Sequence, residues 1–286
     1  MAAPRTQTVR QRRLGVELRK LRENSGMTGE EVAARFSWST AKVSRIETAK
    51  TSAALPDVSA LLALYEVDGH RNNELMALAR DARERGWWMD VVSLDPEYAT
   101  FIAMEDEADT QYIWDNSIIP GLLQTRGYAT AVIQLANAIA TVTPGALGRA
   151  LDVRLQRQNV LTRTSPQKVH CVIDESVLHR PYGGPVTLRE QLEHLMELSL
   201  RENVDLRVIP LEFSFPVVAE PFILLEFAQV HDTRFPDIVH TEGLTAHQSE
   251  KEVETYRYRL AHRRLSEVAL TPGDSRDLLE RLVQKV

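Results

Sequence analysis

The sequence has a single cysteine, Cys171, and no long apolar run among its 286 residues. One cysteine excludes a disulfide framework, and no Cys/His pair has zinc-finger spacing, so we expect a reducing compartment. No stretch approaches the roughly 18 consecutive apolar residues of a membrane-spanning helix, and the N-terminal segment lacks the apolar core of a secretion signal. These absences predict a soluble, cytoplasmic protein that does not bind a membrane.

Basic residues are scarce outside the first 50 positions. Those positions hold eleven Lys and Arg against five Asp and Glu, whereas the rest of the chain holds 23 basic and 35 acidic residues. The net charge of −6 therefore divides into +6 for the head and −12 for the body. No Lys or Arg occurs between Arg85 and Arg126. This asymmetry indicates that only the head binds a polyanion, with a basic disordered tail as the alternative.

The periodicity of residues 9–85 argues against a disordered tail, because it predicts five short helices. The helix signals are a leucine stripe (Leu14, Leu18, Leu21), a break at Asn24–Gly26, a capping box (Thr28, Glu31), a third helix from about Thr40 to Glu47, Pro56 at a helix start, and a last helix that ends near Gly86. We expect a flexible tail at 1–8, a compact helical domain at 9–85 and a second domain at 86–286.

One spacing within the helical domain is specific. Ala33 is small where two helices must approach, and the apolar anchors Val43 and Ile46 follow ten and thirteen residues later. This segment resembles the Cro/repressor (Xre-like) family of helix-turn-helix DNA-binding domains over about residues 9–70. The turn position that usually holds glycine is Ser37, which predicts a left-handed backbone at about 1 kcal/mol of cost. The neighbouring Trp38 either fills the core, which we favour, or stacks on a base.

The resemblance implies that the second helix of the pair lies in the major groove of double-stranded DNA. Arg45 is the strongest candidate base reader, because its guanidinium can bind guanine O6 and N7 together. The resemblance assigns base reading to Thr40, Ala41 and Arg45, phosphate contacts to Arg19, Arg22, Thr28, Ser39, Lys42, Ser44 and Lys50, and structural roles to Ala33, Val43, Ile46 and Glu47. For Arg22, an ion pair with Glu47 and a phosphate contact both remain open.

The body has a different pattern. Val169–Ile173 and Val204–Ile209 are β-rich and enclose a helical stretch at 187–200, which predicts a βαβ unit with parallel strands. Two more strands are expected at 222–227 and 238–240, with two helices after them. The predicted fold class is therefore mainly α, with a five-helix helix-turn-helix domain followed by an α+β domain whose small mixed sheet is flanked by helices.

The body also resembles the C-terminal domain of unknown function that follows Xre-type domains in many actinomycete regulators. The matching stretches are 120–125, 155–163, 174–175, 180–181, 183–185, 221–227 and 242–244. The resemblance implies a small acidic partner protein, often encoded nearby, and it supplies no catalytic residues. Such domains bind two DNA half-sites as a dimer with a two-fold axis, so we expect a homodimer on a near-palindromic operator.

Within the body, the loop after the first β-rich run is the strongest candidate for a ligand or partner site. Its candidates for a ligand or partner are Asp174, Glu175, Arg180, Gly183 and Gly184, and a tight strand-to-helix connection is the alternative that we favour. The scattered histidines have no catalytic context, so we expect no enzyme and no cofactor. The acidic run at 105–109 is interpreted as a solvated helix face rather than a cation site, so no metal is expected.

Two functions remain open. The first is a sequence-specific transcriptional regulator whose C-terminal domain dimerises and receives a partner protein or ligand. The second is an antitoxin-like half of a two-protein module, in which the body sequesters a small partner and the head only autoregulates. Scattered promoter targets would favour the first, and a neighbouring gene for a small protein would favour the second.

Overall fold

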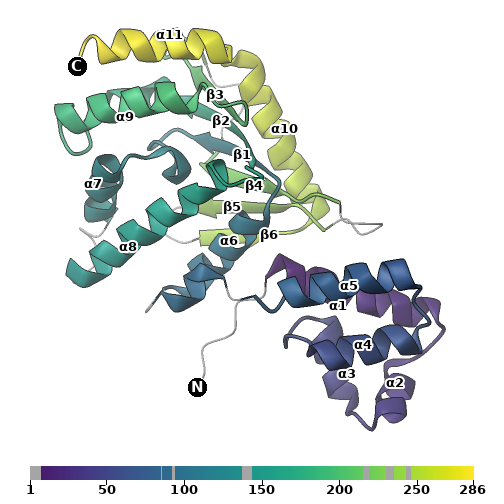
Figure 1. Cartoon of the computed structure of the whole chain (residues 1–286). Coiled ribbons are helices and arrows are strands. Elements are labelled where there is room, and N and C mark those ends of the chain that lie inside the picture. Colours follow the sequence, from purple (N-terminus) through teal and green to yellow (C-terminus); the bar gives the residue numbers. More distant parts are fainter. Residues whose placement is uncertain are drawn as a thin grey trace. The chain divides into compact units, whose positions relative to one another are not determined.

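The computed structural model describes residues 8–84, 86–91, 94–136, 144–214, 219–229, 235–242 and 246–286. The chain folds as two compact units (Figure 1). Unit 1 comprises Met1–Glu107 with Gln229–Phe235, and unit 2 comprises Ala108–Ala228 with Pro236–Val286. Each unit has a hydrophobic core of its own.

Unit 1 is helical, and its five short helices confirm the prediction. They are α1 (Val9–Asn24), α2 (Gly29–Phe36), α3 (Thr40–Glu47), α4 (Leu55–Leu64) and α5 (Gly69–Asp81). A 3₁₀ turn η1 (Trp87–Asp90) and a sixth helix, α6 (Pro96–Glu107), follow. Residues 1–7 of the expected tail lie outside the described residues, and Thr8 caps α1 with its side chain.

The core of unit 1 is formed by the apolar faces that the periodicity predicts. Leu14 and Leu18 of α1 pack with Val32 and Ala33 of α2 and with the buried residues of α3 and α4. A partly buried ion pair joins Glu17 of α1 to Arg71 near the start of α5. These contacts give the helices a fixed arrangement, which a disordered basic tail would lack.

The expected domain boundary at residue 86 differs from the end of unit 1, because α6 packs against α1. The Glu107 carboxylate accepts a hydrogen bond from the Arg10 amide at 2.8 Å, and burial raises the pKa of Glu107 to about 7. Glu105 is only 1% exposed. The interpretation of residues 105–109 as a solvated helix face is therefore wrong for these two glutamates.

Unit 2 is built on a mixed six-stranded sheet with the order β3-β2-β1-β4-β5-β6. The strands are β1 (Thr110–Asp115), β2 (Lys168–Asp174), β3 (Val204–Ile209), β4 (Phe222–Glu226), β5 (Ile238–Glu242) and β6 (Ala246–Ser249). Strands β1, β2 and β3 are parallel to one another, and the remaining pairs are antiparallel. The expected α+β fold with a mixed sheet is confirmed, and β1 and β6 were not expected.

Helices cover both faces of this sheet (Figure 1). On one face α7 (Arg126–Ala136), α9 (Pro185–Leu198) and α11 (Pro272–Val283) pack on the larger core, while α8 (Pro144–Arg157) packs on α7. On the other face α10 (Glu252–Val268) places Leu265 against Trp114, Val172 and Leu224. Cys171 lies in the larger core, where burial raises the pKa of its thiol. None of the described helices is long and apolar enough to span a membrane.

Candidate nucleic-acid interface

Helices α2 and α3 both begin with a hydroxyl cap. The Thr28 side chain accepts a hydrogen bond from the Glu31 amide at 3.2 Å, and the Glu31 carboxylate accepts one from the Thr28 amide at 2.8 Å. Ser39 accepts a hydrogen bond from the Lys42 amide at 3.2 Å. The expected capping box and the expected cap of the third helix are confirmed. Caps of this kind satisfy backbone N–H groups that have no partner within the helix.

The turn between these helices is a left-handed helix end. Ser37 has φ 55° and ψ 36°, as expected at this position. The Trp38 amide donates to the Ala33 carbonyl at 2.8 Å, and the Ser37 amide donates to the Ala34 carbonyl at 3.3 Å. This pair of hydrogen bonds is a Schellman motif, which ends α2 sharply and directs the chain into α3.

We expect Ser37→Gly to stabilise unit 1 by about 0.5–1 kcal/mol, because glycine adopts this conformation without the steric cost that a serine Cβ incurs. Hydrogen exchange of the α2 and α3 amides in the full chain measures this free energy. Ser37→Ala is the matched control and is expected to leave it nearly unchanged. Faster exchange in Ser37→Gly than in the parent chain would contradict the assignment of strain to this residue.

Helix α3 is held by its apolar face and by a close approach to α1. Val43 and Ile46 are 2% and 4% exposed, as their spacing predicts. A Cβ placed on Gly15 of α1 would lie 2.6 Å from the Glu47 carbonyl oxygen. Gly15 therefore allows α1 and the end of α3 to touch through their backbones. The prediction from sequence did not include Gly15, although a glycine in the middle of an amphipathic helix is a signal of close packing.

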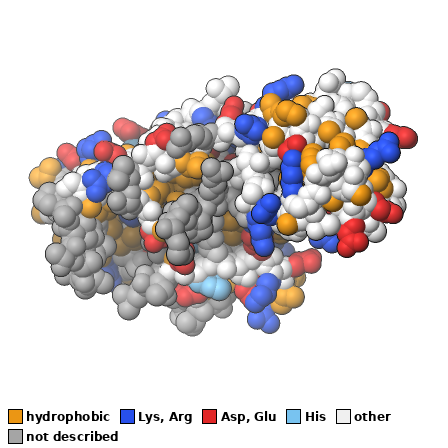
Figure 2. Space-filling model, turned by 90° about the horizontal axis from the view of Figure 1, so that it is seen from below, with side chains coloured by type: hydrophobic (Ala, Val, Ile, Leu, Met, Phe, Trp, Pro, Cys, Tyr) orange, Lys and Arg blue, Asp and Glu red, His pale blue; other side chains and the backbone are white. Residues whose placement is uncertain are grey.

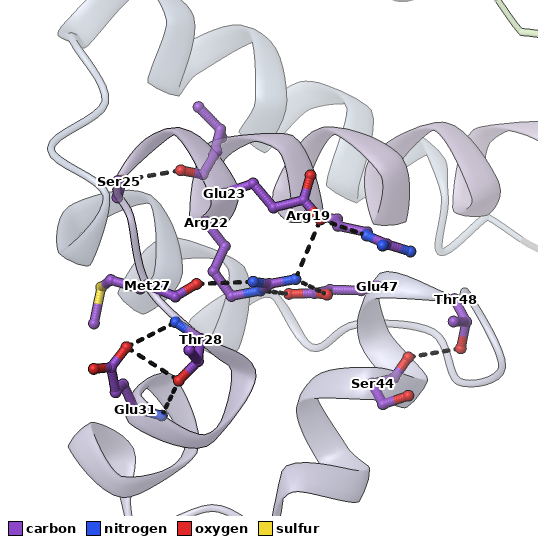
Figure 3. A network of polar contacts seen from close by, with 11 residues as sticks. Arg19, Arg22, Glu23, Ser25, Met27, Thr28, Glu31, Ser44, Glu47 and Thr48 are labelled. Carbon is purple, nitrogen blue, oxygen red and sulfur yellow. Dashed lines mark hydrogen bonds and ion pairs between the residues drawn. The ribbon is translucent and has the colours of Figure 1, made fainter.

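An ion pair joins α1 to the end of α3 (Figure 3). Arg22 Nε lies 2.6 Å from one Glu47 carboxylate oxygen, and its Nη2 lies 3.0 Å from the other. The remaining Nη1 donates to the Met27 carbonyl at 2.8 Å. This arrangement is the ion pair that the resemblance implied. Because all three guanidinium nitrogens bond within the protein, the geometry favours a structural role for Arg22 over the phosphate contact.

The outer face of α3 is open to solvent. Thr40, Ala41, Ser44 and Arg45 are exposed, opposite the buried Val43 and Ile46. Within the described part of the chain, neither Arg45 nor the exposed Lys50 has an ion-pair partner. Arg19 of α1 is also exposed, although its guanidinium pairs with Glu23 at 2.8 Å. The structure thus leaves Arg45 and Lys50 able to reach a ligand without first breaking an ion pair.

Lys42 is placed differently from the other candidate phosphate contacts. Its ammonium lies 2.9 Å from the Asp57 carboxylate, near the start of α4, and 3.7 Å from the centre of the Trp38 ring. Trp38 itself is half-buried and packs on the core of unit 1 beside Phe36. Trp38 therefore fills the edge of the core, as favoured. A DNA phosphate would therefore have to compete with Asp57 for Lys42. The sequence did not predict this ion pair.

Charged side chains of both signs occupy the described surface of unit 1. On the face seen in Figure 2, Lys and Arg side chains of this unit are interspersed with acidic and apolar ones. Within the described residues, no three His, Cys, Asp or Glu side chains gather as metal ligands would.

The candidate residues of the second domain form a capped connection between β2 and α9. Asp174 accepts a hydrogen bond from the Ser176 amide at 2.9 Å, and Glu175 accepts one from the Leu211 amide at 3.1 Å. Gly183 and Gly184 have φ of 80° and 93°, which lead the chain into Pro185 at the start of α9. Arg180 is exposed beside them. These contacts are typical of a tight strand-to-helix connection, the interpretation that we favour from the sequence over a ligand or partner site.

Two family models match the chain. A helix-turn-helix domain matches residues 13–75, and a domain of unknown function (DUF5753) matches residues 98–281. No curated protein and no solved structure matches the chain. The first match spans the α2–turn–α3 segment described above, and the second spans most of unit 2.

Proposed function

The chain belongs to the DUF5753 family, and from this premise we propose that it is a sequence-specific transcriptional regulator that binds double-stranded DNA as a homodimer. The helix-turn-helix domain suggests a DNA-binding regulator. In our proposal the head binds the operator, while the DUF5753 domain dimerises and receives a partner protein or ligand, for which a small acidic protein is the candidate. We propose no catalytic role for either part.

The observation that carries this proposal is the exposed face of α3. Its N-terminal and central residues, Thr40, Ala41, Ser44 and Arg45, are open to solvent, while Val43 and Ile46 anchor the opposite face. A recognition helix needs this division, because base edges in the major groove are reached only by side chains that the core does not hold. The Arg22–Glu47 ion pair fixes the helix before DNA binds. We propose that Thr40, Ala41 and Arg45 contact bases and that Ser39, Ser44 and Lys50 contact phosphates.

We propose a homodimer because one recognition helix contacts only a short length of DNA. One recognition helix reads only about 4–6 base pairs, whereas two helices related by a two-fold axis read two half-sites about one helical turn apart. In unit 2, three large apolar side chains of α10 are exposed along one stripe: Val253, Tyr256 and Leu260 are 65%, 63% and 41% exposed. Their spacing places them on one face of the helix, opposite Leu265 in the core. We propose that a second copy of the chain covers this stripe.

The charges on this face of α10 suit an antiparallel pairing of two copies. Glu252 lies at the start of the stripe, and two arginines, Arg263 and Arg264, lie at its end, where they share Glu267 as their ion-pair partner. A two-fold axis that sets Tyr256 of one copy against Leu260 of the other also sets Glu252 against Arg264. Such isologous pairing is the commonest form of a homodimer interface. The parallel arrangement would bring like charges together.

Leu260→Glu is expected to weaken the dimer roughly tenfold or more, because it places a carboxylate in the apolar centre of the proposed interface. Light scattering of the full chain at micromolar concentration measures the change. Val186→Glu is the matched control, since Val186 is an exposed apolar residue on α9. A dimer that survives Leu260→Glu, or a parent chain that is monomeric, would contradict this assignment of the interface.

The function itself is tested by selection of bound duplexes from a random DNA library with the full chain. We expect enrichment of an inverted repeat whose half-sites are about 10–11 base pairs apart. Absence of any enriched sequence would contradict sequence-specific binding. Mapping of bound sites in cells, with and without the small acidic protein, distinguishes a transcriptional regulator from the antitoxin-like half of a two-protein module. Binding confined to the chain's own promoter would favour the two-protein module.

A further inference from the structure

Lys42 differs from the other cations on and just after α3, because the protein itself holds its charge. The Lys42 ammonium lies 2.9 Å from an Asp57 carboxylate oxygen and 3.7 Å from the centre of the Trp38 ring. Arg45 and Lys50, in contrast, have no ion-pair partner in the described part of the chain. One cation of the proposed DNA-binding surface is therefore already engaged within unit 1 before any DNA binds.

The carboxylate that holds Lys42 belongs to the first turn of α4. Asp57 is the third residue of this helix, after Leu55 and Pro56, and the next residue, Val58, is fully buried in the core of unit 1. The start of α4 has no side-chain cap, and an acidic residue in the first turn interacts favourably with the helix dipole. The backbone that carries this carboxylate is therefore anchored in the core, at a place in the helix that suits a negative charge.

Both partners of this ion pair are partly withdrawn from solvent. The side chain of Lys42 is 34% exposed and that of Asp57 is 23% exposed. Solvent screens such a pair less than a fully exposed one, and an ammonium over the face of a Trp ring gains a cation–π attraction in addition. Transfer of Lys42 to a DNA phosphate would break both contacts and leave the Asp57 carboxylate unpaired beside a second anion. These losses oppose a phosphate contact by Lys42.

Lys42 lies among the proposed DNA contacts, so its restraint affects binding. Its amide donates a hydrogen bond to Ser39, a proposed phosphate contact, at 3.2 Å, and the preceding residue, Ala41, is a proposed base contact. A lysine ammonium is carried on a flexible four-carbon chain. Once released from Asp57, the Lys42 ammonium has the reach to contact the DNA backbone beside the start of α3.

We propose that Asp57 is a positioning residue that keeps Lys42 off the DNA backbone and so limits how tightly unit 1 holds duplexes of any sequence. The inference rests on the proposed function, because it requires α3 to lie against DNA. Phosphate contacts add affinity through counterion release and carry no sequence information directly. With one such contact withheld, base contacts such as that of Arg45 supply a larger share of the affinity.

Asp57→Asn tests this role in titrations of the full chain with a duplex of random sequence at several salt concentrations. We expect binding to tighten roughly threefold or more at low salt, and the slope of log affinity against log salt to steepen by about 0.9 for each Lys42 that gains a phosphate. Asp81→Asn is the matched control, because Asp81 is exposed on α5 and has no ion-pair partner among the described residues. It changes the net charge equally and should leave the slope unchanged.

A double-mutant cycle shows whether the gain comes from Lys42. In the Lys42→Gln chain, we expect Asp57→Asn to add little affinity and no change of slope, because no ammonium remains to move to a phosphate. An equal gain with and without Lys42 would mean that Asp57 acts only by repelling DNA. That result would overturn the positioning role.

Asp57→Gln repeats the test with a residue that is common at the third position of a helix, and hydrogen exchange of the α4 amides shows that each variant is folded. If the parent chain binds random duplexes and neither folded variant alters the affinity or its salt dependence, the positioning role is wrong and the proposed function stands. If the parent chain binds no duplex even at low salt, the proposed function fails, and this inference fails with it.

Discussion

Gly15→Ala is expected to destabilise unit 1 by about 3 kcal/mol, although alanine is the better helix former by about 1 kcal/mol. The reason is the approach of α1 to the end of α3, where the added Cβ would lie 2.6 Å from the Glu47 carbonyl oxygen and 2.9 Å from the Ile46 carbonyl oxygen. Both atoms belong to the backbone, so no side-chain rotation relieves the overlap. The two helices must separate, and the Arg22–Glu47 ion pair separates with them.

Hydrogen exchange of the α1 and α3 amides in the full chain measures this destabilisation within unit 1 itself. Gly69→Ala is the control, because a Cβ at the first residue of α5 would meet nothing within 4 Å. We expect that variant to equal or slightly exceed the parent chain in stability. If Gly15→Ala is as stable as Gly69→Ala, the close approach of α1 and α3 is not a feature of the folded protein.

This contrast shows what the sequence could predict about unit 1. Periodic leucines and the Thr28–Glu31 capping box depend on neighbouring positions, so the helices and their starts followed from local pattern. The spacing of Ala33, Val43 and Ile46 likewise predicted which face of α3 is buried. Gly15 and Asp57 contact residues of α3, although they lie on other helices of the chain. Their effects depend on how the helices pack, which no local pattern contains.

The second unit was predicted less completely, for a similar reason. The βαβ unit was evident because β2, α9 and β3 alternate within one stretch of sequence. Strand β1 lies at the centre of the sheet, yet its six residues follow an acidic run and precede no strand-like neighbour. Arg154 and Gln124 come from separate segments, and only the fold brings them together. A search of the sequence for local motifs therefore could not predict this contact.

Arg45→Ala is expected to weaken binding to the selected operator by about 1–3 kcal/mol per half-site and to relax the preference at one base pair of each half-site. The Arg45 side chain is exposed on α3 and has no ion-pair partner among the described residues, so its loss should leave unit 1 folded. A guanidinium that binds guanine O6 and N7 together discriminates bases, because no other base pair presents two acceptors in that arrangement.

Lys50→Ala is the control that distinguishes the loss of a base contact from the loss of one positive charge. Lys50 is also exposed and also lacks an ion-pair partner in the described part of the chain, but it follows the end of α3, where a phosphate contact is expected. Its loss should weaken all duplexes alike and reduce the dependence of affinity on salt by about one counterion per half-site. Titrations of the full chain with the operator and its single-base variants, at several salt concentrations, distinguish the two effects. If Arg45→Ala lowers every affinity by the same factor, as Lys50→Ala does, then Arg45 contacts the backbone and another face of α3 reads the bases.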